Sequence, residues 1–113
     1  MSALTDKQAR FSGMVGALLV YADKLEDYRV RLDWAYRSPE ANAGVNGHPR
    51  SLHIRRLAID LVLDKRTAAG RWQYQSHTAA YEPLGEFWES LGGAWGGRFG
   101  DGGHFSLEHG GVK

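Results

Sequence analysis

The stretch SLHIRRLAIDLVLDK, residues 51–65, places a charge inside a segment that is otherwise apolar. Its LAIDLVL portion, residues 57–63, has five large aliphatic side chains in seven positions, which is typical of a buried strand. Asp60 lies at the centre of this portion. An ionised carboxylate taken out of water costs at least several kcal/mol unless a partner compensates it. The partner could be an arginine or lysine, a set of hydrogen-bond donors, or a metal ion.

His53 precedes Asp60 in the same stretch, and imidazole and carboxylate are the usual zinc ligands apart from thiolates. In one extended strand the two residues would lie roughly 23 Å apart, at about 3.3 Å per residue. They can reach one ion only if the chain turns between them, and we expect that turn in the polar IRR segment, residues 54–56. The alternative is an ion pair between Asp60 and Arg55 or Arg56.

A zinc site needs a third ligand, and the candidates are His48, His77, His104 and His109. His104 follows the glycine-rich segment GDGG, where a backbone can pass close to a site. Two imidazoles and one carboxylate would leave a fourth position for water, which is the open arrangement of a catalytic zinc site. Asp101, shortly before His104, could then act as a base. On the residues alone, the favoured alternative is a turn residue that bonds its own backbone.

The hydrophobic periodicity predicts a helix, three strands, a second helix and a last strand. Thr5 can cap the first helix, and Gly92–Gly93 should end the second. Segment 38–50 is expected to be a long loop and segment 93–103 a glycine-rich turn. We therefore expect an α+β fold: a small, mainly antiparallel sheet with two main helices in a single domain. The expected ranges are 5–25 and 79–93 for the helices, and 28–37, 57–65, 70–74 and 104–109 for the strands.

The composition indicates one folded domain that spans residues 1–113. The net charge of +1 is too balanced to suggest a nucleic-acid partner. The chain has no cysteine, so a bound metal must use His, Asp or Glu. The longest apolar run near the N-terminus, residues 14–22, is too short to span a bilayer, and no clear cleavage site follows it. We expect neither stable membrane insertion nor a signal peptide.

Two separated segments, SLHIRRLAIDL at 51–61 and PLGEFWESLGGAWGGRFGDGGHFSLEH at 83–109, together resemble a family of peptidoglycan peptidases. That family contains D-alanyl-D-alanine carboxypeptidases and L-alanyl-D-glutamate endopeptidases, including VanX- and VanY-like enzymes and many phage endolysins. Its pattern is S-x-H-x(6)-D, followed downstream by an acid shortly before a histidine. Arg56 departs from the pattern, because many relatives have glycine there. A turn with positive φ would be strained at this residue by about 1 kcal/mol.

The resemblance implies one zinc ion with three protein ligands, which are His53, Asp60 and His104. It also implies that Asp101 is the catalytic acid and base and that Arg37 polarises the scissile carbonyl group. Ser51 matches a hydroxyl group that orients the substrate or the site. Asp60 would then be stable in its apolar strand because a dication is its partner.

The function that the resemblance implies is hydrolysis of an amide bond in the peptidoglycan stem peptide. The leading form is an L-alanyl-D-glutamate endopeptidase, an endolysin in phage-mediated cell lysis. A D-alanyl-D-alanine carboxypeptidase and a non-catalytic module that binds a wall peptide are the alternatives. The expected partner is the stem peptide, with no nucleic acid, and the expected state is a monomer. We expect synthesis in the host cytoplasm and action on the cell wall in the periplasm.

Overall fold

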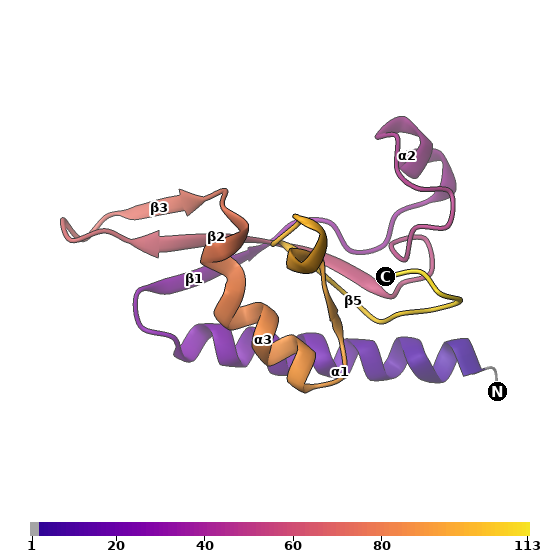
Figure 1. Ribbon diagram of the computed structural model, residues 1–113, viewed down its shortest axis with the longest axis horizontal. Coiled ribbons are helices and arrows are strands. Elements are labelled where there is room, and N and C mark those ends of the chain that lie inside the picture. Colours follow the sequence, from indigo (N-terminus) through magenta and orange to yellow (C-terminus); the bar gives the residue numbers. More distant parts are fainter. Residues whose placement is uncertain (1–2) are drawn as a thin grey trace.

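The long helix α1 lies beside an antiparallel sheet, α3 packs close to it, and the β2–β3 hairpin extends beyond the C-terminal end of α1 (Figure 1). The computed structural model describes residues 3–113. Every named strand pair in this part of the chain is antiparallel. The predicted α+β fold, with a small antiparallel sheet and two main helices in one domain, is therefore confirmed.

The elements alternate along the chain in an order close to the predicted one. The helices are α1 (Ala3–Lys24), α2 (Pro39–Gly44) and α3 (Glu82–Ser90), with short 3-10 helices at Thr78–Tyr81 and Gly96–Phe99. The strands are β1 (Tyr28–Leu32), β2 (Ala58–Arg66), β3 (Trp72–Gln75), β4 (Ala94–Trp95) and β5 (His104–Ser106).

Strand β2 is the centre of the sheet, because it pairs with β1, β3 and β5. Its first residues, 58–60, pair with β5, and its later residues pair with β1 and β3. Strand β4 extends the sheet beyond β5. The register places Asp60 directly opposite His104. The stretch that predicts a buried strand thus holds the whole sheet together.

The apolar stripe of α1 faces the core, as its helical spacing predicts. Its buried members are Phe11, Met14, Leu18 and Ala22. The helix begins at Ala3, so Thr5 lies inside it and not at the cap position. None of the helices in residues 3–113 has the length and apolar character needed to cross a membrane.

The segment predicted as a long loop, 38–50, contains the helix α2. Ser38 caps this helix, since its Oγ accepts a hydrogen bond from the backbone N–H of Ala41 at 3.1 Å. Pro39 follows in the first turn, where its missing N–H costs nothing. The prediction of a loop throughout segment 38–50, made from its polar and glycine-rich composition, was therefore wrong for α2.

Three other boundaries differ from the prediction. Strand β1 ends at Leu32, although the next residues stay beside β2 through bonds from Asp33 N to Asp60 O and from Asp60 N to Trp34 O. The second helix begins as a 3-10 turn, and α3 proper starts next to Pro83. The glycine-rich segment 93–103 contributes β4, and the last strand ends at Ser106.

Trp88 of α3 is the largest fully buried side chain of the core. Its Nε1 donates a hydrogen bond to the Ser106 carbonyl oxygen at 2.9 Å, so its polar atom is satisfied inside the core. Its ring packs edge-on against Phe11 of α1 and Phe105 of β5. The Trp88 side chain therefore connects α1 and α3 to the sheet.

Replacement of Trp88 by alanine should lower the free energy of unfolding by about 3–5 kcal/mol, because it removes this packing and leaves a cavity. Urea unfolding followed by circular dichroism would measure the change. Val20→Ala is the matched control, since Val20 is 56% exposed and its loss should change stability by less than about 0.5 kcal/mol. Equal effects of the two substitutions would contradict this account of the core.

Asp64 is a second acid of β2, and its side chain is only 4% exposed. Its Oδ2 accepts hydrogen bonds from Arg29 Nε at 2.9 Å and Arg31 Nε at 3.0 Å, and its Oδ1 accepts one from Arg31 Nη2. The hydrogen bond from Arg31 lowers the pKa of Asp64, although burial opposes that shift. Asp64 is thus stabilised by ion pairs with arginines, the kind of partner that the sequence analysis considered for Asp60.

Asp64→Asn should weaken the acid dependence of stability. A carboxyl group whose pKa is lowered by folding contributes stability that is complete above its unfolded pKa, about 3.9, and is lost as pH falls through the folded value. The stability difference between the wild type and Asp64→Asn should therefore shrink between about pH 6 and about pH 3. Urea titrations at several pH values would test this, and a constant difference would disprove it.

Candidate metal centre

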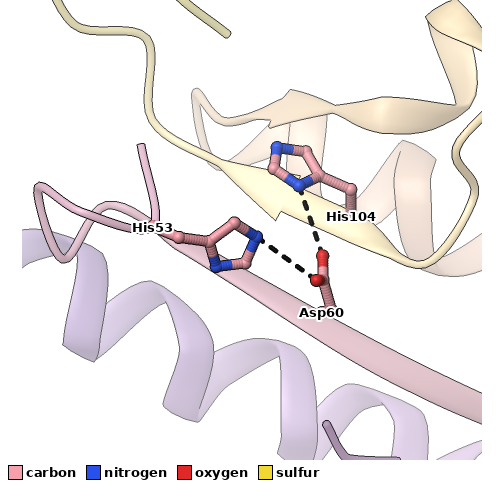
Figure 2. A group of neighbouring side chains, drawn as sticks. All are labelled: His53, Asp60 and His104. Carbon is pink, nitrogen blue, oxygen red and sulfur yellow. Dashed lines mark hydrogen bonds and ion pairs between the residues drawn. The ribbon is translucent and has the colours of Figure 1, made fainter. Parts of the chain in front are cut away.

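His53, Asp60 and His104 meet at one point, although they come from a turn and two strands (Figure 2). One ligand atom from each lies within 4.8 Å of the other two. Asp60 Oδ2 is 3.2 Å from His53 Nε2, and Asp60 Oδ1 is 3.3 Å from His104 Nδ1. The three residues proposed from the sequence as metal ligands are therefore brought together, as one metal ion would require.

A tight turn positions His53 beside Asp60 and His104. Backbone bonds from Arg56 N to His53 O and from Leu57 N to Leu52 O close the turn, so the change of direction predicted within residues 54–56 is present. Arg56 has φ of +58°, a left-handed conformation that costs an L-residue roughly 1–2 kcal/mol. Its guanidinium group lies 4.0 Å from the centre of the Tyr36 ring, a cation–π contact that offsets part of this strain.

The tautomer of His53 is fixed by its second nitrogen. Nδ1 lies 2.7 Å from the backbone carbonyl oxygen of Ala35, which can only accept, so Nδ1 carries the proton. The Nε2 of a neutral imidazole then turns its lone pair towards Asp60 Oδ2. Two acceptors at 3.2 Å need a proton or a cation between them. This arrangement, in a histidine only 3% exposed, fits a metal ligand with its orienting partner.

His104 reaches the centre through the pairing of β5 with β2. Its Nε2 is buried and has no hydrogen-bond partner among the described residues. A buried polar nitrogen without a partner costs roughly 1–3 kcal/mol, so hydrogen bonding alone does not account for the orientation of this ring. The orientation does aim Nδ1 at Asp60 and at the common point.

Asp60 is charged at neutral pH despite its place in an apolar strand. Burial raises its pKa, but hydrogen bonds from the imidazoles of His104 and His53, which these rings donate to Asp60 when both are protonated, outweigh burial and lower the pKa to about 2. Arg37 Nη2 lies 3.9 Å from Asp60 Oδ2 and adds a more distant positive charge. Neither Arg55 nor Arg56 pairs with Asp60 in the described part of the chain, so the ion pair first considered for it does not form.

Asp101 lies in the turn that leads into β5. Its backbone N–H donates to Gly96 O, and its carbonyl oxygen accepts from His104 N. A side chain at Gly96 would place a Cβ 2.4 Å from the Asp101 carbonyl oxygen and 2.7 Å from His104 Cβ, so only glycine fits there. The carboxylate of Asp101 makes no hydrogen bond among residues 3–113, unlike a turn residue that bonds its own backbone.

Asp101 and Asp60 line the same cleft, which has a volume of about 240 Å³. Asp101 is exposed as a residue, but partial desolvation of its carboxyl group raises its pKa, and the charge of His104 opposes that rise. The other polar side chains along the cleft belong to Asp33, Tyr74, Ser76, Thr78 and Tyr81. An unbonded carboxylate thus lies in the same open cleft as Asp60.

Arg37 and Ser51 also lie at the centre. The backbone N–H of Arg37 donates to His53 O, and its guanidinium group is held beside Asp60. The hydroxyl oxygen of Ser51 accepts a hydrogen bond from His53 N at 3.2 Å, so Ser51 orders the turn that carries His53. The remaining histidines point elsewhere; His48, for example, accepts from Arg50 N.

Sequence reasoning missed Asn42, whose side chain contacts Arg37. Asn42 is buried and belongs to α2, within the segment taken for a loop. A signal for that helix was present in Ser38–Pro39–Glu40, a cap followed by proline and an acid in the first turn.

Two imidazoles and one carboxylate facing one point are a donor set that suits a single divalent ion, and the carboxylate also lines an open cleft. The family model described as D-alanyl-D-alanine carboxypeptidase matches residues 45–107, which include all three of these residues and Asp101. This is more than half of the chain. The chain belongs to this family of metal-dependent peptidoglycan peptidases. A search of curated proteins gives no match.

Addition of zinc should stabilise the protein against unfolding. An ion that binds only the folded state adds about 2.7 kcal/mol when its concentration is a hundred times its dissociation constant. Calorimetric titration should give one site per chain, and a chelator should reverse the rise in melting temperature. His53→Ala should abolish both effects, whereas the matched control His77→Ala, at an exposed histidine, should preserve them. Equal zinc binding by His53→Ala would remove His53 from the site.

Proposed function

We propose that this protein is a zinc-dependent peptidase that hydrolyses an amide bond in the peptidoglycan stem peptide. The observation that carries the proposal is the convergence of His53, Asp60 and His104 beside a cleft that holds the free carboxylate of Asp101. Membership of a peptidoglycan peptidase family supports the substrate class.

Zinc is the ion that the donor set favours. Two imidazole nitrogens and one carboxylate oxygen suit zinc and its neighbours in the transition series, whereas calcium and magnesium prefer oxygen ligands alone. We assign His53 Nε2, His104 Nδ1 and an oxygen of Asp60 as the ligands. When bound, the ion would polarise the scissile carbonyl group and lower the pKa of a water molecule towards about 7.

The remaining steps fall to side chains of this chain. Asp101 accepts the proton of the attacking water and later passes it to the leaving amine. Its carboxylate makes no hydrogen bond among the described residues, so both oxygens are available to take and give a proton. Arg37 donates to the oxyanion that develops on the carbonyl oxygen, an interaction often worth about 3–4 kcal/mol. Ser51 acts through the turn that it orders, by holding His53 in place and helping to orient the site.

The charges along the cleft favour an endopeptidase, with the L-alanyl-D-glutamate bond as the proposed target. Among the described residues, those lining the cleft include three aspartates and no arginine or lysine, and Arg37, 3.9 Å from Asp60, is assigned to the oxyanion. A carboxypeptidase must recognise the free terminal carboxylate of its substrate, which usually takes a cation or several donors. The family description favours the second candidate, a D-alanyl-D-alanine carboxypeptidase. A binding module without catalysis would have no use for the unbonded carboxylate of Asp101.

The proposed setting is lysis of a host cell by a bacteriophage. In that setting the protein is made in the host cytoplasm and acts as a monomer on the cell wall in the periplasm. The resemblance of segments 51–61 and 83–109 to phage endolysins supports this proposal.

Asp101→Asn should lower kcat at least roughly a hundredfold while zinc binding is retained, because it removes the proton acceptor and spares the ligands. Purified peptidoglycan would be digested and the new termini identified by mass spectrometry. New L-alanine carboxyl ends identify an endopeptidase, and released D-alanine identifies a carboxypeptidase. Glu108→Gln, at an exposed acid outside the cleft, is the matched control and should remain active. Full activity of Asp101→Asn would exclude Asp101 from the mechanism.

A further inference from the structure

The guanidinium group of Arg37 is held by a neutral amide and an aromatic ring. Its Nη1 donates a hydrogen bond to Asn42 Oδ1 at 3.0 Å, and its Cζ lies 4.5 Å from the centre of the Trp34 ring. We propose that Asn42 is a positioning residue, which aims Arg37 at the reacting carbonyl group without neutralising its charge. The catalytic part of this inference rests on the proposed function; the positioning part does not.

Asp60 does not fix Arg37 in this place. The distance from Arg37 Nη2 to Asp60 Oδ2 is 3.9 Å, which is too long for a hydrogen bond. The shortest polar contact of the guanidinium group is therefore the one to Asn42. Nη2 consequently remains available to a second acceptor near the metal centre.

An amide and a carboxylate at position 42 would have different effects on the positive charge of Arg37. A carboxylate at position 42 would form a stronger, charge-assisted bond and would cancel most of the field of the guanidinium group. An amide oxygen gives direction with no net charge, so the positive charge stays available for an oxyanion. Arg37 has only 11% of its side chain exposed, and water therefore screens this charge weakly.

Asn42 is itself held rigidly. It is 3% exposed, and its Nδ2 donates to the His48 carbonyl oxygen at 2.9 Å. This bond identifies which amide atom is nitrogen, and so leaves the oxygen facing Arg37. At Gly47, a Cβ would lie 2.0 Å from Asn42 Oδ1 and 3.0 Å from Arg37 Nη1, so glycine leaves the space that this contact needs. Because Asn42 is buried and each polar atom of its amide has a partner inside the chain, we assign it no direct contact with substrate.

The alternative is that Asn42 serves only to hold segment 38–48 through its bond to His48. The two roles separate in a double-mutant cycle with Arg37. A positioning residue has no effect on catalysis once the group that it positions is gone, whereas a structural residue does.

Asn42→Ala should lower kcat between roughly tenfold and a hundredfold, with KM changed less than about twofold and zinc binding intact. In the Arg37→Ala background the same substitution should change kcat by less than about twofold. Gly47→Ala, which keeps the amide but displaces it, should reproduce the loss of kcat. Asn46→Gly is the matched control, because Asn46 is exposed, has φ of +55°, and tolerates glycine. An equal loss from Asn42→Ala with and without Arg37, or no loss at all, would overturn the proposal.

A second readout needs neither metal nor substrate. In the metal-free protein, ¹⁵N-edited NMR should show separate, slowly exchanging Nη signals for Arg37, because hydrogen bonding restricts rotation of the guanidinium group. Asn42→Ala should average these signals, and Asn46→Gly should leave them separate. If the wild type cleaves no stem peptide but the NMR signals behave in this way, the proposed function fails and the positioning role stands. Averaged signals in the wild type would refute the positioning role whatever the activity.

Discussion

The carboxylate of Asp60 is the constraint on which the rest of this structure depends. It lies in the strand that pairs with β1, β3 and β5, so the charge cannot be moved without disturbing the sheet. Two imidazoles flank it, one from a turn close in sequence and one from the strand opposite, and a cation shared by all three would compensate its charge. The fold and the site are therefore not separable. The pairing of β2 with β5 that closes the sheet is the same pairing that sets Asp60 against His104.

The segment after β1, residues 33–37, supports the residues of the site through its backbone and the Trp34 ring. The Ala35 carbonyl oxygen accepts from His53 Nδ1 and thereby selects the tautomer whose Nε2 lone pair faces the centre. The Trp34 ring packs against the guanidinium group of Arg37. The backbone N–H of Arg37 donates a hydrogen bond to the His53 carbonyl oxygen and so holds the turn. Alternation of apolar and polar residues predicted a strand here. Strand β1 instead ends at Leu32, and the following residues stay beside β2 while the backbone groups of Ala35 and Arg37 bond to His53.

The sequence predicted which residues meet at the centre better than it predicted the surrounding segments. Chemistry and spacing made His53, Asp60 and His104 candidates, and the resemblance of segments 51–61 and 83–109 to a peptidase family selected this set; the structure brings the three together. The left-handed turn at Arg56 was anticipated as a departure from glycine. Helix α2 was not predicted, because a helix of six residues is too short to show a periodic pattern of apolar residues. The contact of the Asn42 side chain with Arg37 was not predicted either, because it depends on tertiary packing.

The charges assembled at the centre explain why a neutral residue stands at position 42. A divalent ion and Arg37 would bring three positive charges, and Asp60 and Asp101 would bring two negative ones. The centre then carries one net positive charge, which an oxyanion on the reacting carbonyl group would neutralise. An acid in place of Asn42 would remove that surplus before the reaction began, and a lysine there would oppose metal binding by repulsion. An amide, fixed on its other side by the His48 carbonyl oxygen, orients the cation and leaves the balance unchanged.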